Sequence, residues 1–197
     1  MNRENDFALV PRAPGALEKA EPGAKRILSG MIAETLALVK KEPLPKACPI
    51  RIVVVFEEEG PRESINIILR TWFNKDATVV TFADSEMAWQ ELAQTDPDLL
   101  ITDYRMSRLS GKEILQRLLD RKATYPIILM SGMETTDLLM WVRECASRGL
   151  NIKFLNLPFN ITLFLKVIAA SLRLPFPDSE KSEILRDTTA KPVEGEP

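Results

Sequence analysis

Histidine is absent from the 197 residues of this chain. Its absence excludes histidine as a general base, catalytic triads that contain histidine, metal sites built on imidazole, and a phosphohistidine on this chain. The two cysteines, Cys48 and Cys145, form neither a disulfide framework nor the spacing of a metal site. Such sparse cysteine usage is typical of a reducing cytoplasm.

Strong charge of one sign and long apolar runs are missing as well. The net charge is only -2 and no dense block of lysine or arginine occurs, so electrostatics give no support for nucleic-acid binding. No apolar run reaches the roughly 18 residues that span a bilayer, and the amino terminus lacks the apolar core of a signal peptide. We therefore expect a soluble, cytoplasmic protein without a membrane segment.

The two ends of the chain differ in composition from its centre. Residues 1–22 are rich in proline, alanine and charge and predict a flexible segment. Residues 23–41 have apolar side chains at helical spacing and predict an amphipathic helix, followed by a proline-containing linker at 42–49. The apolar face of that helix needs a partner, which is either a docking or self-association surface or the chain's own domain. Residues 174–197, with prolines, scattered charge and few apolar side chains, predict a disordered tail.

Residues 50–173 carry the repeating pattern of one α/β domain. Short apolar runs alternate with longer segments whose apolar residues recur at helical spacing. This alternation indicates βαβ units and a parallel sheet. Five repeats favour a flavodoxin-like (βα)5 doubly wound fold with strand order 2-1-3-4-5 and an N-terminal helical extension. The predicted strands cover residues 52–56, 77–82, 97–103, 126–130 and 152–157.

Three of these strands bring polar side chains to their carboxyl ends, where open α/β sheets bind ligands. Glutamates at 57–59 follow the first strand, Asp103 ends the third, and Ser131 follows the fourth. Clustered carboxylates repel one another, and a hard divalent cation with oxygen ligands relieves that repulsion. The pattern predicts either a metal and phosphoryl site around Asp103 or loop acids that are merely solvated. Asp103 alone is also explained as a helix cap or a turn residue.

The domain resembles the receiver domain of two-component response regulators (CheY-like) over about residues 50–173. The resemblance is carried by 97–111, by Pro-Ile-Ile-Leu-Met-Ser-Gly at 126–132 and by Phe-Leu-Asn-Leu-Pro-Phe at 154–159. It implies that a sensor histidine kinase or a phosphotransfer protein passes a phosphoryl group to this domain, with Mg²⁺ as the cofactor.

The same resemblance implies roles for individual residues. Asp103 is the phosphoacceptor and Ser131 the switch hydroxyl. Phe154 falls on the position of the rotating aromatic side chain. The backbone carbonyl of Arg105 and the carboxylate of Asp103 fall on metal-ligand positions.

The chain departs from the family pattern at three points. Receivers end the first strand with two acidic residues, and an ungapped match puts Phe56 and Glu57 there. Glu57, helped by Glu58, is left to hold Mg²⁺ weakly or not at all. The lysine that precedes the proline of strand five is Leu157 here, and Ser-Arg-Leu at 107–109 replaces a Pro-Gly-Met type of turn. A charge pair about 4 Å apart contributes at most about 4 kcal/mol, so losing this lysine weakens a switch that needs ~5.5 kcal/mol.

Two functions therefore stay open. One is a single-domain response regulator that accepts phosphate on Asp103 and signals through protein contacts. The other is a degenerate pseudo-receiver that binds a partner without phosphorylation. We do not expect an enzyme that acts on a small molecule, because no glycine-rich phosphate loop and no second acid–base group are present.

Both functions need a surface for a downstream protein partner. In receivers this surface combines the fourth helix, the fifth strand and the fifth helix, expected here at 135–147, 152–157 and 159–172. Met140 and Trp141 on the first of these helices form either a docking or homodimer patch, or part of a packed helix covered by the amino-terminal segment.

Overall fold

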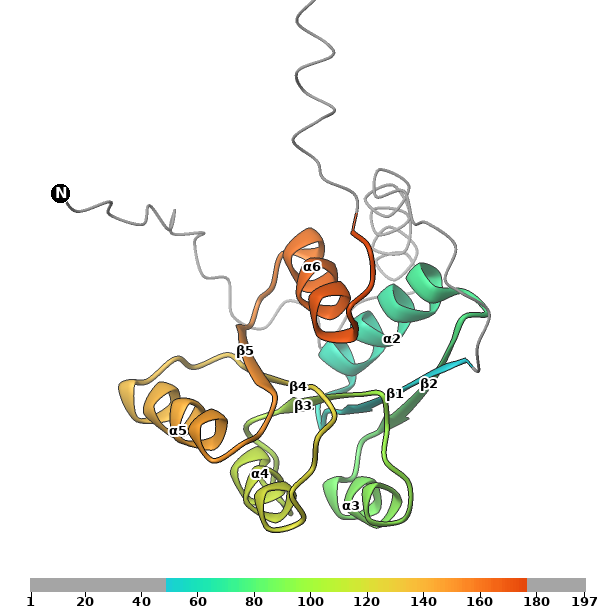
Figure 1. The fold of residues 1–197 in the computed structure, drawn as a ribbon. Coiled ribbons are helices and arrows are strands. Elements are labelled where there is room, and N and C mark those ends of the chain that lie inside the picture. The colour runs from blue at the N-terminus through green and yellow to red at the C-terminus, as the bar shows by residue number, and fades with distance from the viewer. Residues whose placement is uncertain (1–48, 177–197) are drawn as a thin grey trace, which may run out of the picture.

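The structure is a computed structural model that describes residues 49–176 (Figure 1). The segments predicted at 1–22 and 23–41, the linker up to residue 48, and the tail beyond residue 176 lie outside the described residues. None of the helices within the described range has the length and hydropathy to cross a membrane.

Five parallel strands form one sheet, and each strand is followed by a helix. The sheet order is β2-β1-β3-β4-β5, which confirms the predicted flavodoxin-like fold and strand order. The strands are β1 (Ile50–Val55), β2 (Ala77–Phe82), β3 (Leu99–Asp103), β4 (Ile127–Ser131) and β5 (Ile152–Asn156).

The helices cover both faces of the sheet. Figure 1 shows α2 and α6 on one face and α3, α4 and α5 on the other. Alternate residues of β1 divide between the two layers, since side chains alternate along a strand. The helices are α2 (Glu59–Phe73), α3 (Ser85–Gln94), α4 (Gly111–Asp120), α5 (Thr136–Ser147) and α6 (Ile161–Leu172).

Two hydrophobic clusters fill these layers. The α2/α6 cluster lies between the sheet and helices α2 and α6, and it contains Ile52, Val54, Phe56 and Phe164 among others. The α3/α4/α5 cluster lies on the other face and contains Val53, Val55, Leu100, Leu118 and Leu129 among others. β3 is buried along its whole length because helices cover both of its faces.

The carboxyl-terminal end of the domain extends slightly further than the sequence predicts. We placed the end of the domain at residue 173, but the packing continues, because the Phe176 ring stacks on Trp72 with centroids 5.7 Å apart. On α6, Leu163 is 48% exposed although the helix is strongly apolar. α6 is apolar on more than one face, so its periodicity does not decide which leucine is buried.

Candidate functional site

Asp103 is the last residue of β3, between β1 and β4. It is only 9% exposed, yet it lines an open pocket of about 580 Å³ at the carboxyl end of the sheet. This is the position at which doubly wound folds bind ligands. The other residues that line the pocket are Glu57, Glu58, Tyr104, Arg105, Met106, Ser107, Ser110 and Lys112.

Burial raises the pKa of the Asp103 carboxyl, since a charged group loses solvation there. The backbone N–H groups of Arg105 and Tyr104 offset part of that rise. The Arg105 N–H donates to Asp103 Oδ1 over 3.3 Å, which is the contact of a turn aspartate. Asp103 does not cap α4, because Ser110 occupies the N-cap position and forms a capping box with Glu113.

The β3–α4 loop returns close to Asp103 and depends on a glycine to do so. The Gly111 N–H donates to the Tyr104 carbonyl over 2.9 Å. A Cβ on Gly111 would lie 2.5 Å from the Asp103 carbonyl oxygen and 2.8 Å from the Tyr104 Cα. Any larger residue therefore pushes the backbone of Asp103 out of place.

Ser131 ends β4, next to β3 in the sheet. In the strand register its neighbour Met130 pairs with Asp103. The hydroxyl points into its own loop, where it donates to the Met133 carbonyl over 2.9 Å and accepts from the Met133 N–H over 3.1 Å. The Arg105 side chain reaches the same loop, with Nη1 3.3 Å from Met133 Sδ. Arg105 thus connects the β3–α4 and β4–α5 loops.

Phe154 on β5 and Leu157 just after it pack on opposite faces of the sheet. Phe154 is half-buried and packs against the α3/α4/α5 cluster. Leu157 packs against the α2/α6 cluster, and its N–H donates to the Ser131 carbonyl over 2.8 Å. Phe56 belongs to the same α2/α6 cluster and is fully buried. Two of the three departures from the receiver pattern, Phe56 and Leu157, are therefore apolar residues that pack against one hydrophobic cluster.

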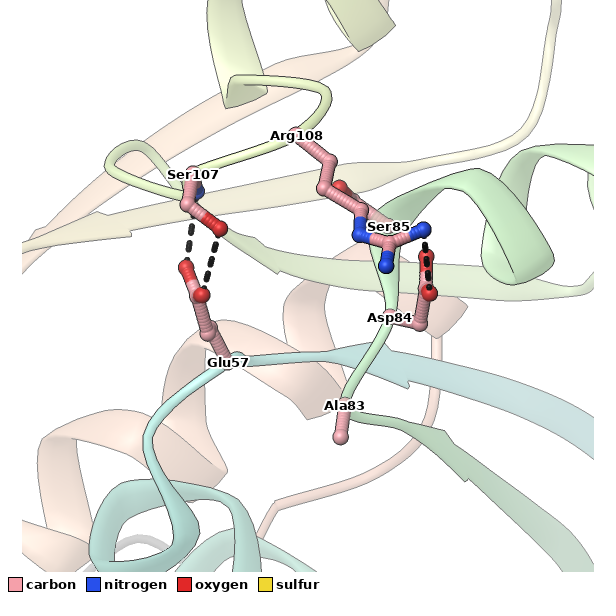
Figure 2. A pocket seen from close by; sticks show the side chains of 6 residues that line it. All are labelled: Glu57, Ala83, Asp84, Ser85, Ser107 and Arg108. Atoms are coloured by element: carbon pink, nitrogen blue, oxygen red, sulfur yellow. Dashed lines mark hydrogen bonds and ion pairs between the residues drawn. The ribbon is translucent and has the colours of Figure 1, made fainter.

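The Glu57 carboxylate is hydrogen-bonded to Ser107 (Figure 2). The carboxylate accepts the Ser107 N–H over 2.7 Å and the Ser107 hydroxyl over 2.5 Å. These two hydrogen bonds hold the pKa of the Glu57 carboxyl below its usual value. The contact joins the β1–α2 loop to the β3–α4 loop, and below we call it the Glu57–Ser107 clasp.

The side chains at the pocket do not fit a Mg²⁺ site as they lie. Mg²⁺ prefers six oxygen ligands in near-octahedral geometry. Phe56 offers no oxygen ligand, and the Glu57 carboxylate is bonded to Ser107. Among the described residues, no group of three or more acidic, histidine or cysteine side chains is gathered closely enough to hold a metal ion. Weak or absent Mg²⁺ binding stays a prediction, now with a physical reason.

Sequence reasoning missed three polar residues near the acidic loop. Ser107 donates hydrogen bonds to Glu57. The sequence hinted at this contact only by having serine in place of the proline of the receiver turn, since proline has no N–H to donate. Arg62 donates from Nη1 to the carbonyl oxygens of Phe56 and Glu57, each over 2.8 Å. Lys112 lines the pocket with Asp103, but its exposed place in the first turn of α4 gave no signal in the sequence.

Comparisons with known proteins agree with this architecture. A family model described as "Response regulator receiver domain" matches residues 52–163. The Transcriptional regulatory protein FixJ of Bradyrhizobium diazoefficiens is 23% identical over 140 residues, which cover 71% of this chain and 65% of that protein. The Regulator of RpoS of Escherichia coli (strain K12) is 32% identical over 85 residues, which cover 43% of this chain and 24% of that protein. The chain thus spans less than two thirds of the length of these relatives.

Solved structures show the same fold. The chemotaxis protein CheY4 of Vibrio cholerae has a TM-score of 0.54 at 19% identity and matches 64% of this chain and 100% of that one. A response regulator receiver protein from Pseudomonas putida has a TM-score of 0.54 at 23% identity and matches 63% of this chain and 98% of that one. At these identities the likeness establishes the fold alone.

Proposed function

The chain belongs to the response regulator receiver family, and we propose that it accepts a phosphoryl group on Asp103 in two-component signalling. The observation that carries this proposal is the carboxyl of Asp103 at the end of the central strand, lining an open pocket. We further propose a sensor histidine kinase or a phosphotransfer protein as the donor. Receiver domains are generally signalling modules and not enzymes, and we propose the same of this chain, with a cytoplasmic location.

The transfer requires one bond to form and one to break. A carboxylate oxygen of Asp103 attacks phosphorus, the P–N bond of the donor phosphohistidine breaks, and its electron pair returns to the imidazole. The product is an acyl phosphate on Asp103. Negative charge on the transferring oxygens needs nearby positive groups. Arg105 and Lys112 line the pocket, and the positive charge of Arg105 offsets a small part of the rise that burial causes in the pKa of Asp103.

We propose that a downstream protein contacts the face formed by α5, β5 and α6. Two large apolar side chains are exposed on these helices, Met140 at 61% and Leu163 at 48%. Trp141 is half-buried, with Lys112 Nζ 5.0 Å from its ring centroid, so Met140 is the better anchor of the two residues singled out in the sequence. A second copy of the chain is one such partner, and the mass in solution of the wild type and of Met140→Lys tests it.

Intact mass spectrometry after incubation with a small phosphodonor tests the phosphorylation, with and without Mg²⁺. The wild type is expected to gain one phosphoryl group, and Asp103→Asn is expected to gain none. Asn is close in size to Asp and keeps an oxygen for the Arg105 N–H. A gain of the same size in Asp103→Asn refutes Asp103 as the acceptor.

The second function, a pseudo-receiver that binds its partner without phosphorylation, is favoured by a specific observation. Leu157 stands at the lysine position and packs against the α2/α6 cluster, and the Ser131 hydroxyl is already bonded to Met133. No phosphoryl gain in the wild type under any of the conditions supports this second function. Partner binding that is equal for the wild type and Asp103→Asn supports it as well.

A further inference from the structure

Three glutamates follow β1, and the first of them is held by a loop from elsewhere in the chain. Both carboxylate oxygens of Glu57 accept from Ser107, one from the N–H and one from the hydroxyl (Figure 2). A cation that bound Glu57 in the pocket of Asp103 would have to compete with these two donors. Hydrogen bonds to a charged group are among the stronger ones in proteins.

Ser107 is able to make this contact because of a departure from the receiver pattern. Receivers usually have proline where this chain has Ser107, and proline has neither an N–H nor a hydroxyl. Both donors of the Glu57–Ser107 clasp therefore arise from a single replacement. The same chain lacks an acid at Phe56, whose side chain is fully buried in the α2/α6 cluster. The β3–α4 loop therefore gains two hydrogen-bond donors at Ser107, and the β1–α2 loop has an apolar residue, Phe56, in place of an acid.

The positively charged guanidinium of Arg62 lies against the β1–α2 loop. Arg62, in the first turns of α2, donates to the backbone carbonyls of Phe56 and Glu57. Its guanidinium satisfies carbonyl oxygens beside the acidic residues. On the other side, Arg108 pairs with Asp84 over 3.3 Å, which ties the β3–α4 loop to the β2–α3 loop. The Glu57–Ser107 clasp and the Arg108–Asp84 ion pair therefore connect three of the loops near Asp103.

We infer that the Glu57–Ser107 clasp, and not a divalent cation, holds the β3–α4 loop against the β1–α2 loop, and that a cation reaches Glu57 only by breaking the clasp. This inference goes beyond the proposed function, because it holds whether or not Asp103 is phosphorylated. Under this inference, Mg²⁺ binds poorly because a cation has to compete with Ser107 for the Glu57 carboxylate.

The competition predicts a graded series of variants. Ser107→Ala removes the hydroxyl and keeps the N–H, whereas Ser107→Pro removes both donors. Loss of one hydrogen bond to a charged group corresponds to roughly a tenfold change in an equilibrium constant. We expect Mn²⁺ affinity, measured by electron paramagnetic resonance on the full chain, to rise roughly tenfold in Ser107→Ala and further in Ser107→Pro.

Two controls make the series specific. Ser147→Ala is the same substitution outside the pocket, where the hydroxyl bonds to the Glu144 carbonyl and not to Glu57, so its Mn²⁺ affinity should match the wild type. The double variant Ser107→Ala/Glu57→Gln should lose the gain, because Gln keeps the shape of Glu57 without its charge. Ser107 is exposed, so Ser107→Ala should fold, as circular dichroism verifies.

Several results overturn the inference. Mn²⁺ affinity in Ser107→Ala equal to that of the wild type rules out the competition. A gain that persists in the double variant shows that the cation does not use Glu57. Submillimolar Mn²⁺ binding by the wild type that Glu57→Gln abolishes shows that Glu57 is a metal ligand already. None of these measurements requires a phosphodonor, so they fail or succeed independently of the proposed function.

Discussion

The Ser131 hydroxyl donates to the carbonyl of Met133 and accepts from the N–H of the same residue. Both interactions remain within the β4–α5 loop, although Ser131 ends the strand beside Asp103. The hydroxyl must leave Met133 before it can donate to a phosphoryl oxygen. If Asp103 accepts a phosphoryl group as proposed and Ser131 donates to it, the rearrangement would alter the loop that precedes α5, the helix that carries the exposed Met140.

Ser131→Ala should reduce the free energy of unfolding by about 1 kcal/mol, because the buried Ser131 side chain loses its two hydrogen bonds to Met133. Urea unfolding followed by tryptophan fluorescence measures the effect. Ser147→Ala is the control, since the Ser147 hydroxyl bonds to Glu144 at an exposed helix end. The control should change stability by less than ~0.5 kcal/mol. Equal stability losses in the two variants would argue against a structural role for the Ser131–Met133 contact.

Gly111→Ala should destabilise the domain by about 2 kcal/mol, because the added methyl overlaps the backbone of Asp103 and Tyr104. Gly132→Ala provides a matched control, since a Cβ there meets no atom within 4 Å. We expect the control to change the free energy of unfolding by less than ~1 kcal/mol. Thermal unfolding of both variants compares them, and a larger loss in Gly132→Ala would contradict the close approach at Gly111.

Restoring an acid at residue 56 should not restore a metal site. Phe56 is fully buried in the α2/α6 cluster, so Phe56→Asp removes a large apolar side chain and buries an uncompensated carboxylate. We expect a loss of about 4 kcal/mol in the free energy of unfolding, measured by urea titration. Glu58→Asp, at an exposed position, should leave stability unchanged within ~0.5 kcal/mol. A stable Phe56→Asp with tight Mg²⁺ binding would show that the side chain is not confined to the core.

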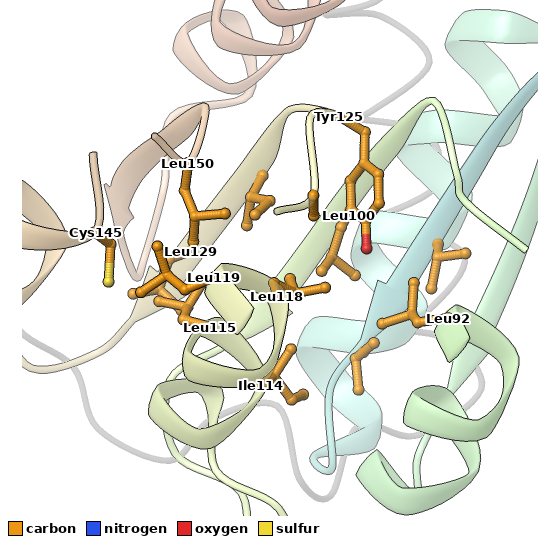
Figure 3. Packing of buried hydrophobic residues seen from close by; sticks show 14 of the residues in the cluster. Leu92, Leu100, Ile114, Leu115, Leu118, Leu119, Tyr125, Leu129, Cys145 and Leu150 are labelled. Atoms are coloured by element: carbon orange, nitrogen blue, oxygen red, sulfur yellow. The ribbon is translucent and has the colours of Figure 1, made fainter. Parts of the chain in front are cut away.

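Tyr125 should make stability depend on alkaline pH. Its ring belongs to the α3/α4/α5 cluster (Figure 3), and its buried hydroxyl has no hydrogen-bond partner among the described residues. Burial raises the pKa of Tyr125 from 10.0 to about 12. The unfolded chain therefore loses the phenol proton first, and stability falls as the pH rises from 10 towards 12.

Tyr125→Phe is the matching variant, because it removes the hydroxyl and keeps the ring. Its urea midpoint should equal or exceed that of the wild type at pH 8. Between pH 10 and 12 its midpoint should fall less than that of the wild type. Parallel falls in the two proteins would show that other groups cause the alkaline loss.

The fold was predictable because its signals are local. β3 is a continuous apolar run that ends in a carboxylate, and the alternation of such runs with helical patterns determines a parallel sheet. That alternation, together with the likeness to receivers, also indicated that Asp103 and Ser131 would lie at one edge of the sheet. Side-chain burial on strongly apolar helices was not predictable, as the exposed Leu163 shows.

The contacts of Glu57 were not predictable from its own surroundings in the sequence. Three consecutive glutamates after a strand suggest a cation site, but Glu57 and Ser107 are separated by 50 positions along the chain. Their contact depends on the exact return of the β3–α4 loop, which Gly111 permits. The replaced proline at Ser107 was visible in the sequence, but only the folded chain shows which carboxylate its N–H meets.

The most direct test of the central claim locates the phosphoryl group on the chain. The protein is incubated with a small phosphodonor, acyl phosphates are reduced with borohydride, and the digested peptides are analysed by mass spectrometry. Reduction converts a phosphorylated aspartate to homoserine. The account predicts homoserine at residue 103 and at no other aspartate. Homoserine elsewhere, with residue 103 recovered as unmodified aspartate, would contradict it.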